Sequence, residues 1–121
     1  MVYWITGRKN SGKTTLAYRL KAQIPNSEVV DADEIRKRDY PDLGYSEVER
    51  RWNIMNLARI AREIEKEGRI AIVAAVSPKR QWRKEAQSIF DDYIEICMPF
   101  GELWEGTDFE EPDYGKRIKK H

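Results

Sequence analysis

The sequence predicts an α/β fold, a parallel sheet of about four strands with helices on both faces. Two observations support this prediction. Short apolar runs alternate along the chain with longer segments in which apolar residues recur every three or four positions. One run, residues 70–76, is apolar without a break, which is typical of a strand at the centre of a parallel sheet. Right-handed crossovers between such strands place helices on both faces.

The first half of the chain begins with a strand and a helix. Residues 2–6 are rich in β-forming side chains and predict a buried strand. Apolar residues four apart predict a helix over residues 14–24, which is followed by proline and asparagine. A second strand is expected at residues 28–31, then a helical turn over 33–38, and turn-forming residues predict a loop at 39–45.

The second half is predicted to contain two further helices and two strands. Ser46 and Glu49 form a capping box, so a long helix is expected to start there and run to about Glu67. After the central strand, Pro78 suits the first turn of the next helix. Residues 93–97 predict the fourth strand.

Length and composition predict one domain over residues 1–121, with residues 99–121 as a short tail and candidate closing element. The 22 basic and 21 acidic residues nearly cancel, which argues against a protein that holds nucleic acid through bulk charge, although a local patch stays open. Apolar runs are too short to span a membrane, so a cytoplasmic protein is expected. Cys97 and His121 are the single cysteine and histidine, which excludes an internal disulfide and histidine catalysis.

A phosphate-binding loop follows the first strand. Residues 7–14 read Gly-Arg-Lys-Asn-Ser-Gly-Lys-Thr and match the pattern G-x-x-x-x-G-K-[ST] of a P-loop. Glycines let backbone N–H groups point at phosphate oxygens, and the helix that follows presents its positive end. Lys13 is expected to reach the β- and γ-phosphates, and the Thr14 hydroxyl to ligate the Mg²⁺ that accompanies ATP. The predicted ATP-binding residues are Gly7, Arg8, Lys9, Asn10, Ser11, Gly12, Lys13, Thr14 and Thr15.

Polar residues gather at the carboxyl ends of the strands, where open α/β sheets bind ligands. Asp31 and Asp33 end the second strand, and a carboxylate there can accept the proton of an attacking hydroxyl or hold a metal. Alternatively, Asp33 simply caps the short helix that follows. Arg50 and Asn53 share one face of the long helix. From spacing alone, a solvated helix face is the plainer interpretation of these two residues.

Three more residues follow the central strand. Ser77 lies directly after it, at the same edge of the sheet. Arg80 and Arg83 fall in the first turns of the next helix and could embrace a phosphate, although ordinary surface charge is the plainer interpretation of each alone.

In order and spacing, the whole series resembles the adenylylsulfate kinase family over about residues 3–98. In that family, a P-loop is followed in order by the motifs Asp-Gly-Asp-Asn-Val-Arg, Asp-Leu-Gly-Phe-Ser, Arg-x-x-Asn-Ile-Arg and Ile-Ser-Pro-Tyr-Arg-x-x-Arg. After its P-loop the chain has Asp31-Ala32-Asp33-Glu34-Ile35-Arg36, Asp42-Leu43-Gly44-Tyr45-Ser46, Arg50-x-x-Asn53-Ile54 and Val76-Ser77-Pro78-Lys79-Arg80-x-x-Arg83.

The resemblance implies transfer of the ATP γ-phosphoryl group to the 3′-hydroxyl of adenosine 5′-phosphosulfate, with Mg²⁺. By position, Asp33 handles the acceptor hydroxyl and the metal together with Thr14, and Asp31 supports it; with Lys13, these aspartates are the catalytic candidates. The implied acceptor-binding residues are Asp33, Arg36, Tyr45, Arg50, Asn53, Val76 and Ser77. Tyr45, which replaces a phenylalanine of the family, is expected to stack on the acceptor adenine.

The chain also departs from the family pattern. Ala32 replaces a glycine, Glu34 an asparagine, and Met55 and Asn56 stand where the family usually has two arginines. The family's lid segment, Cys-Glu-x-Arg-Asp-x-Lys-Gly-Leu-Tyr, has no counterpart after Met98. Either the closing element is shortened or the substrate has changed.

Three functions therefore remain open. The first is an enzyme that resembles adenylylsulfate kinase, with ATP and a small-molecule acceptor as partners and no membrane; a homodimer is compatible with it. The second is a P-loop kinase of the same ancestry that acts on a nucleoside, a polynucleotide 5′ end or a small alcohol. The third is a non-catalytic nucleotide-binding module, against which the intact Lys13, Thr14 and Asp33 argue.

Overall fold

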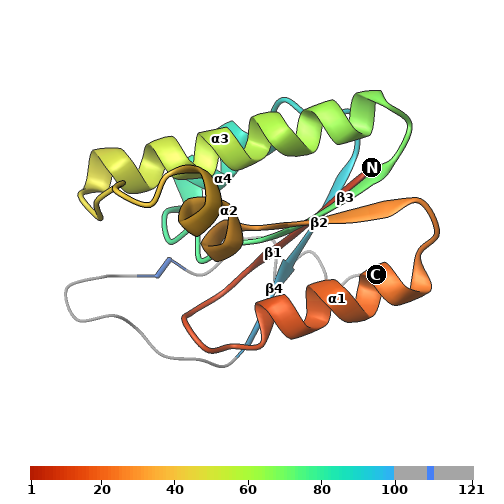
Figure 1. Cartoon of the computed structure of the whole chain (residues 1–121), viewed down its shortest axis with the longest axis horizontal. Helices are drawn as coiled ribbons and strands as arrows, with labels where there is room; N and C mark the ends of the chain where they lie inside the picture. Colours follow the sequence, from red (N-terminus) through yellow and green to blue (C-terminus); the bar gives the residue numbers. More distant parts are fainter. Residues whose placement is uncertain (100–108, 111–121) are drawn as a thin grey trace.

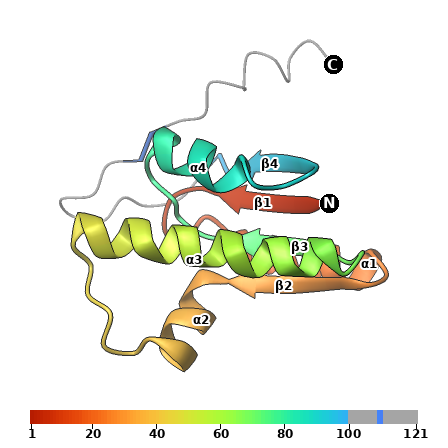
Figure 2. The ribbon, with the colours of Figure 1, turned by 90° about the horizontal axis from the view of Figure 1, so that it is seen from above.

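The computed structural model describes residues 1–99 and 109–110. Its strands pair in parallel in the order β2-β3-β1-β4. Helix α1 covers one face of the sheet, and α3 and α4 cover the other (Figures 1 and 2). The elements are β1 (Val2–Thr6), α1 (Lys13–Gln23), β2 (Ser27–Asp31), α2 (Ala32–Asp39), α3 (Glu47–Lys66), β3 (Ile70–Ala74), α4 (Arg80–Gln87) and β4 (Tyr93–Cys97). The predicted α/β fold with four parallel strands is confirmed.

Alternation along the strands divides the core into two clusters. Trp4 and Val73 pack with α3 and α4, whereas Ile5 and Ile72 face α1 on the other side. All four side chains are fully buried, and so is Leu57 of α3. Because β1 and β3 are covered on both faces, the loops that leave their carboxyl ends start from rigid positions.

The capping box at the start of α3 is confirmed. Ser46 Oγ accepts a hydrogen bond from the Glu49 N–H at 3.2 Å, and the Glu49 carboxylate in turn accepts from Ser46 Oγ at 2.7 Å. The same carboxylate accepts the Gly44 N–H at 2.6 Å. A Cβ on Gly44 would lie 2.6 Å from Glu49 Oε1, so glycine lets the loop before α3 close onto the helix.

The segment after β3 differs from the prediction. The strand ends at Ala74, and α4 begins only at Arg80, so Pro78 lies outside the helix and its assignment to the first turn is wrong. The cause is tertiary: the carbonyl of Pro78 accepts the N–H of Glu110 at 2.8 Å, a contact 32 residues away in sequence that holds the turn out of the helix.

None of the helices in the described part of the chain is long and apolar enough to cross a membrane. The single domain over residues 1–121 and the closing role of residues 99–121 stay predictions. Residues 100–108 and 111–121 lie outside the described residues.

Candidate functional site

The loop between β1 and α1 is shaped for close backbone approach. Gly12 caps α1 with φ 91° and offers no side chain to the N–H groups of the first helical turn. At Gly7, φ is 150°, and a Cβ there would lie 2.9 Å from Met98 Cβ. Glycine at these two positions therefore packs the loop against the end of β4 and leaves the helix N-terminus open to an anion.

Lys13 lies inside the cavity that this loop encloses. Its Nζ donates to the Arg8 carbonyl at 2.8 Å and to Ser11 Oγ at 3.5 Å. Burial lowers the pKa of the Lys13 ammonium, and the Asp33 and Asp31 carboxylates offset part of that effect. We call this space the phosphate cavity; its lining is Lys9, Asn10, Ser11, Gly12, Lys13, Thr14, Thr15, Asp31, Ala32, Asp33, Ala74, Ala75 and Val76.

Asp31 joins the phosphate loop to the next element. Its Oδ2 accepts a hydrogen bond from Thr14 Oγ1 at 2.6 Å. Its Oδ1 accepts the N–H groups of Asp33 and Glu34 at 2.9 and 3.2 Å, which makes Asp31 the N-cap of α2. The alternative in which Asp33 caps this helix is therefore wrong. Asp33 lies in the first turn, where its carboxylate reaches the cavities.

A second cavity adjoins the first. We call it the acceptor cavity; its lining is Ala32, Asp33, Arg36, Tyr45, Arg50, Asn53, Ile54, Ala75, Val76, Ser77 and Pro78. All seven residues that the sequence predicted for acceptor binding are in this lining. The two cavities share Ala32, Asp33, Ala75 and Val76, and of these four only Asp33 can be ionised.

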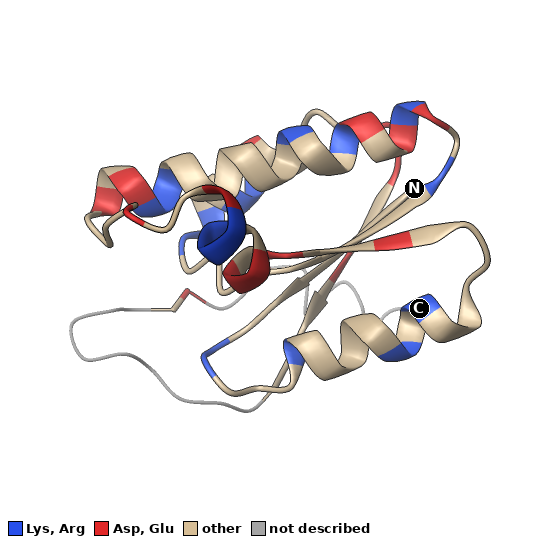
Figure 3. Ribbon diagram, in the orientation of Figure 1, with Lys and Arg blue, Asp and Glu red and all other residues tan. Residues whose placement is uncertain are grey.

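Two arginines organise the loop that carries Tyr45. Arg36 donates to the carbonyls of Leu43 and Gly44 at 2.9 and 3.0 Å, and its guanidinium lies 4.2 Å from the centre of the Tyr45 ring. Arg50 Nε donates to the Tyr45 carbonyl at 3.1 Å. The ring stays 58% exposed, which leaves aromatic surface at the rim of the cavity. In Figure 3, basic and acidic positions are interspersed along α2 and α3. Arg36 and Arg50 therefore supply positive charge at their own positions and not as part of a larger basic patch on these helices.

Asn53 lines the same cavity and carries a buried, unpaired acceptor beside it. Asn53 is only 5% exposed. Within the described residues, Asn53 Oδ1 has no hydrogen-bond partner. A buried amide oxygen without a donor is costly, which favours a ligand donor at this position.

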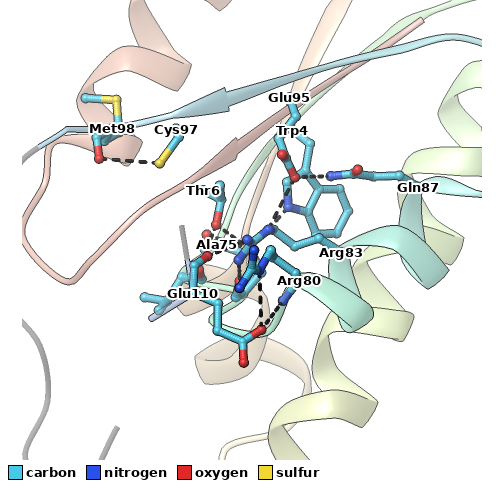
Figure 4. A network of polar contacts seen from close by, with 12 residues as sticks. Trp4, Thr6, Ala75, Arg80, Arg83, Gln87, Glu95, Cys97, Met98 and Glu110 are labelled. Carbon is cyan, nitrogen blue, oxygen red and sulfur yellow. Dashed lines mark hydrogen bonds and ion pairs between the residues drawn. The ribbon is translucent and has the colours of Figure 1, made fainter. Parts of the chain in front are cut away.

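The wall formed by Ser77 is held by core side chains, among them those of Trp4, Thr6 and Arg83, which Figure 4 labels. Trp4 Nε1 donates to Ser77 Oγ at 3.2 Å, and the Thr6 hydroxyl lies 2.8 Å from the same oxygen. Arg83, which is 2% exposed, donates to the Ser77 carbonyl at 2.6 Å and pairs with Glu95 at 3.4 Å.

Both interpretations that the sequence left open for Arg83, a phosphate ligand and ordinary surface charge, are therefore wrong, because its guanidinium is buried and bound to the protein interior. Arg80 is half-exposed and lies outside the linings of both cavities. The supporting roles of Trp4, Thr6 and Arg83 escaped sequence reasoning. The sequence held one indication of these roles: Thr6 is a polar residue at the end of a strand that is otherwise apolar.

The chain is similar to known proteins both in sequence and in fold. The family model described as adenylylsulphate kinase matches residues 1–110. A probable adenylyl-sulfate kinase from Archaeoglobus fulgidus is 38% identical over 99 aligned residues, in an alignment that covers 78% of this chain and 64% of that protein. The chain thus spans less than two thirds of that relative's length.

Two solved structures share the fold. An APS kinase from Mycobacterium tuberculosis, in complex with AMPPNP and APS, superposes with a TM-score of 0.70 at 25% identity and covers 98% of this chain and 67% of that one. A hexameric APS kinase from Thiobacillus denitrificans gives 0.76 at 28% identity, over 93% of this chain and 23% of that one.

Proposed function

The chain belongs to the adenylylsulphate kinase family, and from this premise we propose that it transfers the γ-phosphoryl group of ATP to the 3′-hydroxyl of adenosine 5′-phosphosulfate. The observation that carries the proposal is the position of Asp33. Its side chain lines both the phosphate cavity and the acceptor cavity, where a group that serves the two substrates at once must lie.

The donor side rests on the phosphate loop. Backbone N–H groups at the start of α1 and the Lys13 ammonium bind the triphosphate and stabilise charge on the transferring group. The oxygen donors of Thr14, Asp31 and Asp33 suit Mg²⁺, which favours a few carboxylate and hydroxyl oxygens beside substrate phosphates. Bound with ATP, Mg²⁺ would supply charge neutralisation at the β- and γ-phosphates.

On the acceptor side, Asp33 orients the attacking hydroxyl and accepts its proton as the new P–O bond forms, while the bond from the γ-phosphorus to the β-γ bridging oxygen breaks and ADP leaves. The adjacent arginines, Arg36 and Arg50, present positive charge to the phosphosulfate anion. Tyr45 offers an exposed aromatic face for the adenine. Asn53 Oδ1, which lacks a donor among the described residues, accepts a hydrogen bond from the nucleotide.

A second candidate is a kinase of the same fold with another hydroxyl acceptor. It is favoured by the substitutions at the site, since Ala32 lines both cavities and Asn56 stands in α3 where the family usually has arginine. The acceptors to be considered are a nucleoside, a polynucleotide 5′ end and a small alcohol. A nucleotide-binding module without transfer is the third.

One assay separates these candidates. ATP labelled in the γ-phosphate is offered with adenosine 5′-phosphosulfate, with mixed nucleosides, with small alcohols and with a 5′-hydroxyl oligonucleotide, and transfer is measured for each. We expect transfer to the phosphosulfate, and its loss in a Lys13→Ala control. Transfer to another acceptor alone would support the second candidate, and ATP binding without transfer to any of them the third.

A further inference from the structure

The acceptor cavity has one wall in a strained conformation. Ser77 adopts φ 37°, in the left-handed region that side chains other than glycine rarely occupy. Such a conformation persists only where the surrounding structure holds it in place, and it is concentrated at ligand sites. The contacts that hold Ser77 therefore also fix the shape of this cavity.

Some of those contacts come from a distant part of the sequence. The Glu110 N–H donates to the Pro78 carbonyl at 2.8 Å, and the Glu110 carbonyl accepts from Arg83 Nη2 at 2.5 Å. The Arg83 guanidinium lies 5.1 Å from the centre of the Phe109 ring and donates through Nη1 to the Ser77 carbonyl. One buried guanidinium thus bridges the carbonyls of Ser77 and Glu110.

The Glu110 side chain adds a second link. Its Oε1 accepts the N–H of Arg80 at 2.9 Å, at the first residue of α4. This helix has Lys79 as its N-cap, makes no hydrogen bond from that side chain, and has no acidic residue in its first turn. Glu110 therefore supplies from 30 residues away the capping carboxylate that α4 lacks locally.

We propose that Glu110 and Arg83 are positioning residues for the acceptor substrate. Glu110 caps α4 and binds the Pro78 carbonyl, while Arg83 binds the Ser77 carbonyl. Together they hold the turn that forms the cavity wall (Figure 4). The inference rests on the proposed function in one respect, that this cavity receives the hydroxyl acceptor. Neither residue lies in the lining of the phosphate cavity, so ATP binding should not depend on them.

The test compares Glu110→Ala, Glu110→Gln and Arg83→Lys in the full chain. Alanine removes the cap, and glutamine keeps an oxygen that can accept the Arg80 N–H. Lysine keeps the charge but places its donors on one nitrogen, in place of the planar fork whose two nitrogens bind the Ser77 and Glu110 carbonyls. Glu63→Ala is the matched control, since Glu63 is an exposed glutamate of α3 whose carboxylate pairs with Lys66. The readouts are the acceptor KM, the ATP KM, kcat, the free energy of unfolding and amide hydrogen exchange over residues 76–82.

For Glu110→Ala we expect the acceptor KM to rise about fivefold, with kcat and the ATP KM changed by less than about twofold. Glu110→Gln should restore most of the acceptor affinity, Arg83→Lys should resemble or exceed the alanine variant, and Glu63→Ala should change nothing. Loss of stability in Glu110→Ala with an unchanged acceptor KM would mean a purely structural contact and overturn the proposal.

If the wild-type chain transfers phosphate to no acceptor, the proposed function is wrong, but the positioning role of Glu110 and Arg83 is not yet contradicted. Hydrogen exchange then decides the positioning role. Faster exchange over residues 76–82 in Glu110→Ala, but not in Glu110→Gln or Glu63→Ala, supports it, and unchanged exchange overturns it.

Discussion

The hydroxyl of Thr14 donates a 2.6 Å hydrogen bond to Oδ2 of Asp31, whose other oxygen caps α2. One carboxylate therefore ties the phosphate loop to the helix that carries Asp33. The two aspartates, two positions apart, have different tasks: Asp31 arranges the site, and Asp33 faces both cavities.

This division predicts different consequences for two matched substitutions. Asp33→Asn should leave the free energy of unfolding and ATP affinity nearly unchanged and lower kcat by about 10²–10⁴, the usual effect of losing a positioned base or metal carboxylate. Asp31→Asn keeps a capping oxygen but loses the negative charge at the start of α2, so it should lower the free energy of unfolding by about 0.3–1 kcal/mol, with a smaller loss of kcat. Chemical denaturation and steady-state kinetics measure both. A loss of stability confined to Asp33→Asn would contradict this assignment.

Lys13→Ala should largely abolish phosphoryl transfer and weaken triphosphate binding, because it removes the ammonium that lies within the phosphate loop. Nucleotide affinity by calorimetry and transfer from labelled ATP check this. Lys66→Ala provides the control, since Lys66 is exposed at the far end of α3. Wild-type turnover in Lys13→Ala would contradict the assignment of this loop as the triphosphate-binding site.

Asn53→Leu should separate stability from acceptor binding. Replacement of a buried, unpartnered amide oxygen by an apolar side chain of similar size should leave the free energy of unfolding unchanged or raise it by up to about 1 kcal/mol. The acceptor KM should rise while the ATP KM stays the same, and Arg50→Ala should show the same split. If Asn53→Leu impairs ATP and acceptor binding equally, this face of α3 is structural.

Glu65 predicts an acid-sensitive contribution to stability. Burial alone would raise the pKa of its carboxyl, but the Asp91 N–H, the Arg62 guanidinium, the Met1 ammonium and the Asp92 N–H together lower the pKa to about 2 from the ordinary value of 4.5. A depressed carboxyl pKa stabilises the folded state above pH 4.5, and that stabilisation is lost as the pH falls toward 2.

The ionised Glu65 carboxylate is expected to contribute roughly 2–4 kcal/mol to the free energy of unfolding. This contribution is measured as the difference in unfolding free energy between the wild type and Glu65→Gln. That difference should be full at pH 7 and shrink between pH 4.5 and 2. Glu63→Gln, at an exposed position of the same helix, should show little pH dependence. A difference between wild type and Glu65→Gln that stays constant down to pH 2 would contradict the shifted pKa.

Local sequence patterns predicted the elements well and long-range contacts poorly. The strand and loop around Gly7 and Gly12, and the capping box at Ser46, depend on residues within a few positions, so their spacing was sufficient. Strand ends placed Asp33 and Ser77 at the ligand-binding edge of the sheet, whereas the full set of acceptor-binding residues came from the resemblance to the adenylylsulfate kinase family.

The errors share a cause. Pro78 is a good first-turn residue by local preference, yet its carbonyl is taken by Glu110. Arg83 has the helical position of a surface residue, yet Ser77 and Glu95 draw it into the core. Each of these outcomes was set by tertiary packing that no local pattern encodes.

The order of the strands also has a consequence during synthesis. β3 lies between β2 and β1 and pairs with both, whereas β2 and β1 do not touch each other. The first two strands to leave the ribosome therefore have no partner until residues 70–74 have emerged. At about 5–20 residues per second, the chain spends seconds with its nucleotide loop translated but unsupported. We expect the nascent chain to become resistant to protease abruptly, when β3 has emerged and pairs with both β1 and β2.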